Sequence, residues 1–188
     1  MGWGSIGHKI INKNITLSFP AELSMLQFWS DSLAAHGSDA DYRKSWDPDE
    51  DIKHYIDIDN YPEFVTEGKI SSDRDSLIAK YGSSFVLTQG ILPWAIIETF
   101  YSLQAALQQG NWPDAMLFAS DLGHYVGDCH MPLHLTLNYN GQYSGQYGIH
   151  SRYESTMINT YQQQIIFSGD TIGIILQPFL YNPQREKA

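Results

Sequence analysis

The sequence is poor in cysteine and in positive charge, and it has no long apolar run. Its one cysteine, Cys129, has no partner for an internal disulfide, so we expect it to serve as a small apolar residue. Lysine and arginine number 11 against 21 acidic residues, which gives a net charge of −10. This balance argues against a broad basic surface that would bind nucleic acid through its phosphates. The longest apolar stretches, such as 174–176, are far shorter than the roughly 20 residues of a bilayer span, and we expect no transmembrane segment.

The composition is that of a folded protein. Hydrophobic residues make up 43% of the 188 residues and charged residues 17%, which excludes a disordered or low-complexity chain. This length suits one ordinary domain with a substantial core. Repeats and linker-like stretches are absent from the sequence, so we predict a single domain over residues 1–188.

Helical patterns dominate and strand patterns are scarce. Apolar residues follow a period near 3.6 in the first segment, and proline, glycine and polar clusters mark the breaks between segments. The segments expected to be helical are 6–17, 22–35, a short element around His54, 74–81, 85–109 with Pro93 as a kink or an early start, 112–130, a helix resuming near Ser151, and an apolar segment at 172–180. The segments 37–52 and 138–148 are expected to be loops. The class is therefore all-α.

A histidine and a carboxylate recur four residues apart in the second half of the chain. The pairs are His124/Asp128 and His150/Glu154, and His134 lies between them. On a helix, residues at this spacing share one face, so each pair offers an imidazole and a carboxylate to one point. Zinc accepts both ligand types, and five ligands exceed the share of one ion. The alternative interpretation of such a pair is a surface ion pair or a helix cap.

These residues lie in stretches that resemble a known family. The stretches GHYVGDCHMPLH (123–134) and GIHSRYE (148–154), together with the N-terminal stretch from Trp3 to His8, resemble the zinc-dependent phospholipase C and S1/P1 nuclease family. The resemblance covers most of the chain and rests on the spaced pattern H-x3-D-x5-H…H-x3-E. It implies an all-helical bundle with a multi-zinc cleft that holds two or three Zn²⁺ ions.

The resemblance also implies a ligand set. One zinc would be held by Asp41, His54, His124 and Asp128, and a second by His134, His150 and Glu154. A third would be held by His8, by Asp128 as a bridge, and by the amino and carbonyl groups of Trp3. Asp39 stays an alternative to Asp41, and either carboxylate alone is also a common turn residue.

The sequence departs from the family pattern near both ends. Met1 and Gly2 precede Trp3, so the free amine expected as a ligand is absent unless these two residues are removed. A secretory signal would end just before Trp3, and we therefore expect a secreted or periplasmic protein. Only 34 residues follow Glu154, fewer than is usual in the family, so we expect part of the cleft wall to be missing.

The function implied is that of an enzyme, a zinc-dependent phosphoric diester hydrolase. Asp41 is the candidate that orients or deprotonates the attacking water. Tyr42, Asn138 and Asn140 are candidate substrate-binding residues by the same resemblance, although loop asparagines commonly serve turns. Asp57 and Asp59 are candidates to orient the imidazoles, whereas His36 and His130 are expected to be structural or supporting.

Two substrate classes remain open, with a third reading from another class. Glu154 and Tyr42 match the phospholipase branch, and with the acidic charge they favour phospholipid or a small phosphodiester. Ile6 stands where those phospholipases carry a choline-binding glutamate, and the pattern W-G-x-x-G-H looks like the nucleases. A single-stranded nucleic acid would require stacking aromatics, for which we consider Tyr139, Tyr143 and Tyr147. The third reading is a non-catalytic, zinc-stabilised binding module.

Overall fold

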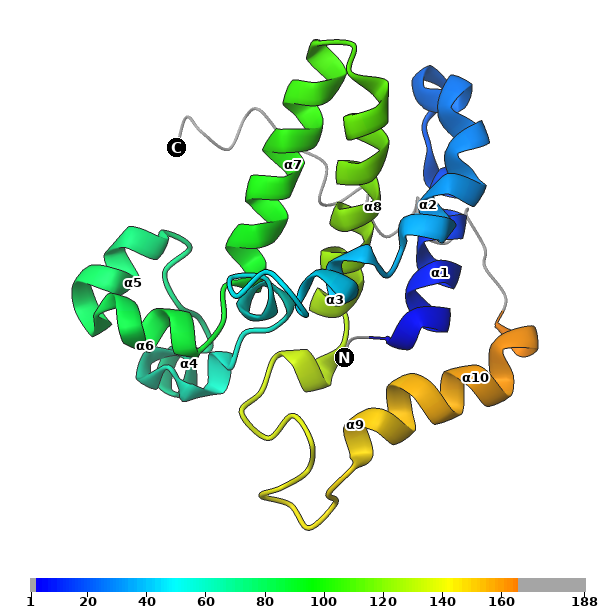
Figure 1. Cartoon of the computed structure of the whole chain (residues 1–188). Helices are drawn as coiled ribbons and strands as arrows, with labels where there is room; N and C mark the ends of the chain where they lie inside the picture. Colours follow the sequence, from blue (N-terminus) through cyan, green and yellow to red (C-terminus); the bar gives the residue numbers. More distant parts are fainter. Residues whose placement is uncertain (1–2, 166–188) are drawn as a thin grey trace.

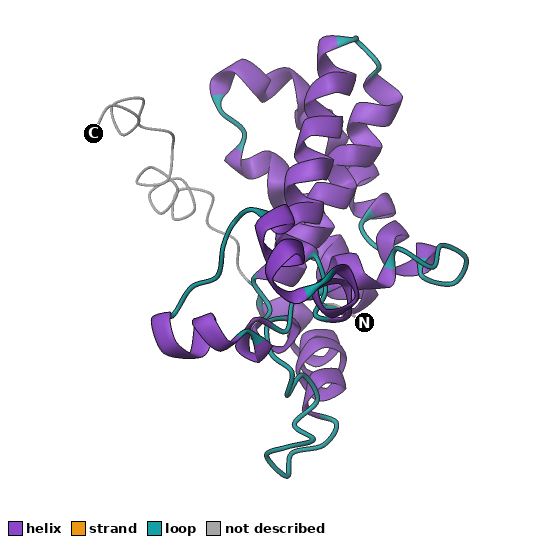
Figure 2. Ribbon diagram, turned by 90° about the vertical axis from the view of Figure 1, so that its left-hand side faces the viewer, coloured by secondary structure: helices purple, strands orange, loops and turns teal. Residues whose placement is uncertain are grey.

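The computed structural model describes residues 3–165, which are helical with no strand among them (Figures 1 and 2). The all-α prediction is thereby confirmed at the level of class. None of the described helices is long and apolar enough to cross a membrane. The α-helices are α1 (Gly4–Asn14), α2 (Ser30–His36), α3 (Asp39–Arg43), α4 (Pro62–Glu67), α5 (Arg74–Tyr81), α6 (Ser83–Thr88), α7 (Leu92–Gln108), α8 (Trp112–Cys129), α9 (Ile149–Ser151) and α10 (Ile158–Tyr161).

Short 3-10 turns and one π-helical turn join these helices. The 3-10 segments are Ile15–Ser18, Ala21–Trp29, Asp51–His54, Ile58–Asn60, Pro132–His134 and Gln162–Gln164. The π turn spans Arg152–Met157, between α9 and α10. Single π turns inside helices are often found at functional sites, and this one carries Glu154.

Helices α7 and α8 form an antiparallel pair, and α1 and α2 pack beside α8 (Figure 1). The side chain of Asn111 caps α8 by accepting a hydrogen bond from the Asp114 backbone N–H, and Pro113 lies in the first turn. Pro132 follows the end of α8 closely, as expected for a residue that cannot continue a helix. The predicted helix 112–130 is therefore confirmed almost to its ends.

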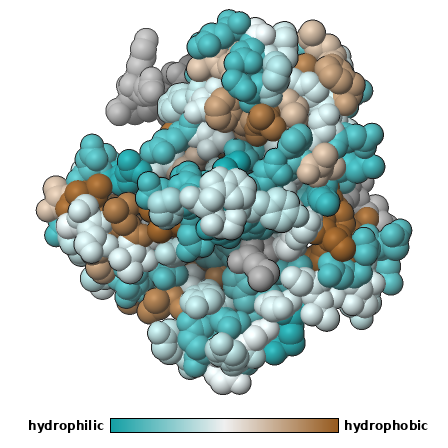
Figure 3. Space-filling model, in the orientation of Figure 1, coloured by the Kyte–Doolittle hydropathy of each residue, from teal (hydrophilic) through white to brown (hydrophobic). Residues whose placement is uncertain are grey.

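Two parts of the core lie on either side of the candidate site. One is formed by Ile56, Tyr61, Leu77, Val86, Ile91 and Trp94, which join the 3-10 turns after His54 to α5 and α6. The other is formed by Leu26, Trp29, Leu33, Ala106 and Ala115, between the 21–36 segment and the far ends of α7 and α8. Figure 3 shows separate hydrophobic patches among hydrophilic residues, rather than one continuous apolar face.

The predicted helix 85–109 is divided into α6 and α7. The expected start at Pro93 is confirmed, since Pro93 lies in the first turn of α7, but residues 89–91 are not helical. Gly90 has φ +85°, and a Cβ there would lie 2.2 Å from the Tyr55 carbonyl oxygen. The Ile91 and Leu92 N–H groups donate to Ile52 O and Tyr55 O rather than along a helix. The break therefore lets the chain hydrogen-bond to the segment that carries His54.

Three other expectations differ from the structure. The predicted loop 37–52 contains α3, and its last two residues begin the 3-10 turn Asp51–His54. The predicted helix 22–35 is a 3-10 segment before it becomes α2. Helix α4 was not predicted, and it begins at Pro62 and ends at Gly68, whose φ is +72°. The expected apolar segment 172–180 lies outside the described residues.

Candidate metal centre

Six segments bring the predicted ligands together. Helix α8 supplies two of them, because His124 and Asp128 are one turn apart on the face that meets α1, α3 and the Asp51–His54 turn. The other segments are α1 (His8), α3 (Asp41), the 3-10 turn before Tyr55 (His54), the turn after α8 (His134) and the helical stretch 149–157 (His150 and Glu154). Most of these side chains are buried, with His8, His54, His124, Asp128, His134 and Glu154 at most 4% exposed.

Four donor atoms meet in what we call the first set: Asp41, His54, His124 and Asp128. His54 Nδ1 lies 2.9 Å from Asp128 Oδ2 and 3.1 Å from His124 Nε2, and the last two atoms are 3.3 Å apart. Asp41 Oδ1 lies 3.7 Å from His54 Nδ1 and 3.8 Å from His124 Nε2. Ligand atoms about 2.0–2.2 Å from a tetrahedral zinc are separated by about 3.2–3.6 Å. The spacing of His54, His124 and Asp128 is close to that requirement, whereas Asp41 lies slightly farther away and forms another group with His8 and His124.

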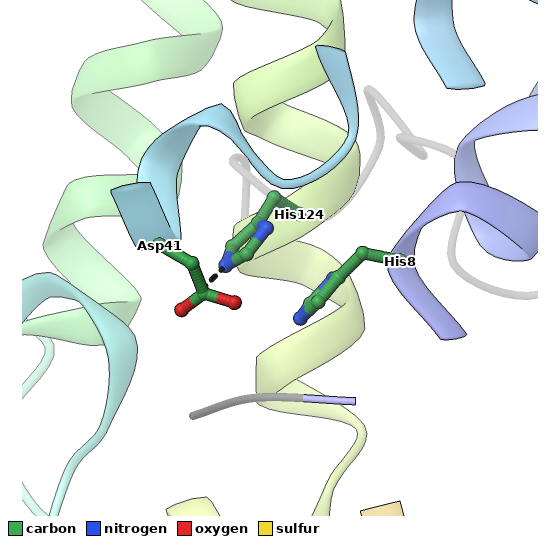
Figure 4. A group of neighbouring side chains, drawn as sticks. All are labelled: His8, Asp41 and His124. Carbon is green, nitrogen blue, oxygen red and sulfur yellow. Dashed lines mark ion pairs between the residues drawn. The ribbon is translucent and has the colours of Figure 1, made fainter. Parts of the chain in front are cut away.

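His8 joins the first set from the other side. Its ring stacks on His124 with centroids 3.6 Å apart, and its Nε2 lies 3.2 Å from Asp128 Oδ1. Figure 4 shows His8, Asp41 and His124 converging from α1, α3 and α8, and donor atoms of these three lie within 4.8 Å of one another. The described contacts of Trp3 are made by its indole, whose Nε1 donates to Gly127 O.

The second set comprises His134, His150 and Glu154. His134 Nε2 lies 3.0 Å from Glu154 Oε1, and His150 Nε2 lies 2.9 Å from Glu154 Oε2. The two sets are neighbours, since His134 Nδ1 is 3.7 Å from Asp128 Oδ1. Glu154 thus lies between the imidazoles of His134 and His150 and is almost fully buried.

Several buried atoms of these residues have no hydrogen-bond partner among the described residues. They are His8 Nδ1 and Nε2, Asp41 Oδ1, His54 Nε2, Asp128 Oδ1 and Glu154 Oε2. Some lie at ion-pair distance from a neighbour, but without the geometry of a hydrogen bond. Buried polar atoms are nearly always paired, so a cluster of orphans calls for an explanation. Histidine nitrogens and carboxylate oxygens that converge and leave several of their atoms unpaired fit a metal-binding donor set, and zinc accepts both.

Backbone carbonyls orient three of the imidazoles. The Nδ1–H groups of His124, His134 and His150 donate to the carbonyl oxygens of Gly37, His54 and Tyr139. A carbonyl oxygen only accepts, so each Nδ1 carries the proton, and in the neutral ring Nε2 is the nitrogen that presents a lone pair toward its set. Such a hydrogen bond behind a histidine is the usual support of a metal ligand.

The suggestion that Asp57 and Asp59 orient imidazoles is wrong. Asp59 accepts hydrogen bonds from Thr136 Oγ1 and Leu137 N, and so holds the chain that follows His134. Asp57 is 9% exposed and lines the cleft, where burial and the charge of Asp59 raise its pKa to about 6. The acidic residue that lies behind a ligand imidazole, outside both sets, is instead Glu50, whose Oε1 lies 3.4 Å from His54 Nε2. Its position one helical turn before His54 was a signal available in the sequence.

Burial and charge act against each other within the first set. Burial raises the pKa of Asp128, but the nearby imidazoles of His124, His54 and His8 favour its charged form, outweigh burial and hold the pKa well below its usual range. Burial lowers the pKa of His8, whereas the bond and charge of Asp128 outweigh burial at His124 and raise its pKa. Burial also raises the pKa of Asp41, but the charges of His124 and Lys44 bring it below its usual value. Both aspartates are therefore ionised at neutral pH.

The structure places Asp41, and not Asp39, beside the imidazoles. Asp39 Oδ2 pairs with His36 Nδ1 at 2.7 Å in a partly exposed position. His130 lies outside both sets, and its Nδ1 bonds Val126 O at the end of α8. His36 and His130 thus take the structural roles expected of them.

A cleft of about 510 Å³ opens onto the second set and onto His54 of the first set. Its lining includes His54, His134, His150 and Glu154, together with Lys44, Asp57, Tyr139 and Asn140. Lys44, whose Nζ lies 2.7 Å from Asp41 Oδ1, was missed in the sequence although it is three residues from Asp41. It brings a positive charge into the cleft of an acidic protein.

The other predicted substrate residues lie elsewhere. Asn138 bonds Tyr143 N and Ser144 Oγ, and so shapes its own loop rather than the cleft lining. Tyr42 is 55% exposed and is not part of that lining. Tyr139 lines the cleft and packs edge-on against His150, whereas Tyr143 and Tyr147 point largely into solvent.

Comparison of the chain with family models, with curated proteins and with solved structures finds no match.

Proposed function

We propose that this protein is a zinc-dependent phosphodiester hydrolase whose substrate is a phospholipid or another small phosphodiester. The observation that carries the proposal is the convergence of two neighbouring histidine and carboxylate sets at one cleft. A closed structural zinc site has four protein ligands, whereas the second set offers three residues beside an open cleft. That difference favours catalysis over a purely structural role.

The first and second sets would each hold one ion, and His8 with Asp128 Oδ1 is placed to take part in a third. When bound, zinc supplies Lewis-acid polarisation of a phosphoryl oxygen and a lowered pKa for water. Imidazole nitrogen combined with carboxylate oxygen suits zinc better than magnesium or calcium, which prefer oxygen ligands alone. Donor chemistry is therefore the reason for naming zinc.

Asp41 is the residue that we assign to proton transfer. Its carboxylate is 17% exposed at the edge of the first set, and its lowered pKa leaves it ionised and able to hydrogen-bond the attacking water. Lys44 pairs with the same carboxylate and lines the cleft, where its ammonium group would attract the substrate phosphate as a point charge. Asn140, also in the lining, offers an amide to a phosphate oxygen.

The acidic net charge supports a small substrate over a long polyanion, because like charges oppose the approach of a nucleic acid. One observation favours the nuclease alternative. Tyr139 lines the cleft with its ring 51% exposed, and such a ring is able to stack on a base.

The test measures bound zinc and then assays the zinc-loaded protein in parallel on phosphatidylcholine, a chromogenic phosphodiester and single-stranded DNA. We expect His124→Ala to abolish hydrolysis and His130→Ala, a histidine outside both sets, to retain it. Hydrolysis of DNA alone, lost in Tyr139→Ala, would establish the nuclease alternative. Zinc binding without hydrolysis of any of the three would favour the non-catalytic binding module.

A further inference from the structure

Glu50 is a buried carboxylate that belongs to neither donor set. It is fully buried, four residues before His54, in the turn that leads into that histidine. Its Oε1 accepts hydrogen bonds from Tyr125 Oη and, at 3.3 Å, from Arg43. Its Oε2 accepts from Lys53 Nζ at 2.9 Å. One carboxylate thus connects α3, α8 and the Asp51–His54 turn directly behind the first set.

His54 presents a different ring nitrogen to its set from the one that His124, His134 and His150 present. His124, His134 and His150 each anchor Nδ1 on a carbonyl and present Nε2. His54 presents Nδ1, which lies 2.9 Å from Asp128 Oδ2, and turns Nε2 toward Glu50 Oε1 at 3.4 Å. That Nε2 is buried and has no hydrogen bond among the described residues. A shift of a few tenths of an ångström would complete one to Glu50.

We infer that Glu50 is the positioning residue of the first set, and that it accepts the Nε2–H of His54 so that Nδ1 is held free for the metal. This inference rests on the proposed function only in requiring that the first set binds zinc. A carboxylate behind a ligand histidine fixes the tautomer and ring orientation and increases the basicity of the coordinating nitrogen. A backbone carbonyl has no full charge and achieves this less strongly.

Neighbouring cations offset the cost of burying the Glu50 carboxylate. Arg43 and Lys53 place two positive charges on Glu50, and Arg43 is itself paired with Asp121 at 2.9 Å. Such a network is tolerated in a protein interior because each charge is compensated and hydrogen-bonded. It also suggests the competing role, in which Glu50 only ties three elements of the fold together. The experiment must separate these two roles.

Zinc affinity measured set by set separates them. Competition titration with a chromophoric chelator would be done on Glu50→Gln and Glu50→Ala in two backgrounds, His150→Ala to isolate the first set and His124→Ala to isolate the second. We expect Glu50→Ala to weaken zinc binding about 10–100-fold at the first set and to leave the second unchanged. Glu50→Gln, which keeps an oxygen acceptor without the charge, should fall between Glu50→Ala and Glu50. Tyr125→Phe removes the hydroxyl that donates to Glu50 but keeps the ring that packs against His54, and it should match the unaltered chain.

Equal weakening of both sets would mean that the fold is disturbed and would overturn the inference, as would no weakening at either. A measurement on the unaltered zinc-loaded protein does not depend on how the variants fold. Two-bond ¹H–¹⁵N spectra should show the His54 proton on Nε2, whereas a proton on Nδ1 would overturn the inference. Absence of phosphodiester hydrolysis in a protein that passes these tests would count against the proposed function and leave the role of Glu50 standing.

Discussion

If the two sets hold zinc, its removal should lower the free energy of unfolding. The size of the loss can be limited from the buried polar atoms that have no hydrogen-bond partner. Six unpaired polar atoms lie on His8 and on members of the two sets. A buried polar atom without a partner costs about 1–3 kcal/mol, and ion pairs such as Asp41 with Lys44 favour the lower end. Even so, the atoms together cost several kcal/mol, a large share of the roughly 5–15 kcal/mol by which domains are stable. Metal ligation would remove that cost.

The stabilisation that bound zinc provides can be expressed as a change in melting temperature. Free zinc at 1,000 times its Kd adds about 4 kcal/mol per site, and 1 kcal/mol shifts Tm by roughly 2–4 °C for a domain of this size. We therefore expect zinc to raise Tm by about 8–16 °C per occupied site relative to protein treated with a chelator. The assay is thermal unfolding followed by circular dichroism with zinc, with chelator, and with magnesium as the control cation.

Two results would refute this reasoning. One is a Tm that agrees within about 2 °C with zinc and with chelator, since the orphan atoms would then have no need of a metal. The other is an equal shift with magnesium, which prefers oxygen ligands and should bind these imidazole-rich sets poorly.

The remaining predictions concern packing and the choice of catalytic carboxylate. In Gly123→Ala the new Cβ would meet Asn12 Oδ1 at 2.4 Å and Ile15 Cδ1 at 2.5 Å, so these two side chains must shift, and we expect a loss of about 1–3 kcal/mol in denaturant unfolding. Gly110→Ala, with φ +69° but nothing within 4 Å, should cost only the backbone strain of about 1–2 kcal/mol, and equal or greater loss there would contradict the packing argument. Asp41→Asn should lower the kcat of phosphodiester hydrolysis about 10²–10⁴-fold, whereas Asp39→Asn should leave it near the original value. A larger loss of kcat in Asp39→Asn than in Asp41→Asn would exclude Asp41 as the base.

The helices that the sequence predicts well are those with local signals. Helix α8 has Asn111 as a cap and Pro132 beyond its end, and α5 has the Asp73 side chain bonded to the N–H groups of Asp75 and Ser76. The sequence indicated a kink or a start at Pro93, but not that α6 and α7 are separate helices, because the break between them depends on hydrogen bonds to the distant Tyr55 and Ile52. Likewise α3 lies in a stretch with loop composition, and its Arg43 pairs with Asp121 of α8.

The candidate site divides in a similar way. The pairs His124/Asp128 and His150/Glu154 follow from spacing along the chain, and the structure holds each pair together. The resemblance favoured Asp41 and left Asp39 as an alternative, and the packing of α3 turns Asp41 toward His124 and Asp39 toward His36. Asp57 was a plausible support for an imidazole, but it lines the cleft instead.

The sequence by itself indicated the helical class and the pairs His124/Asp128 and His150/Glu154, because helical periodicity and four-residue spacing act within one or two turns. His8, Asp41 and His54 were expected only from the resemblance to a known family. Only the tertiary structure decided that α1, α3, α8 and the segments around His54 and Glu154 meet at the two sets. It also decided that Glu50 lies beside His54 and that Lys44 lines the cleft. Contacts between residues far apart in the chain depend on how the helices pack. A local sequence pattern does not indicate which distant residue a side chain will contact.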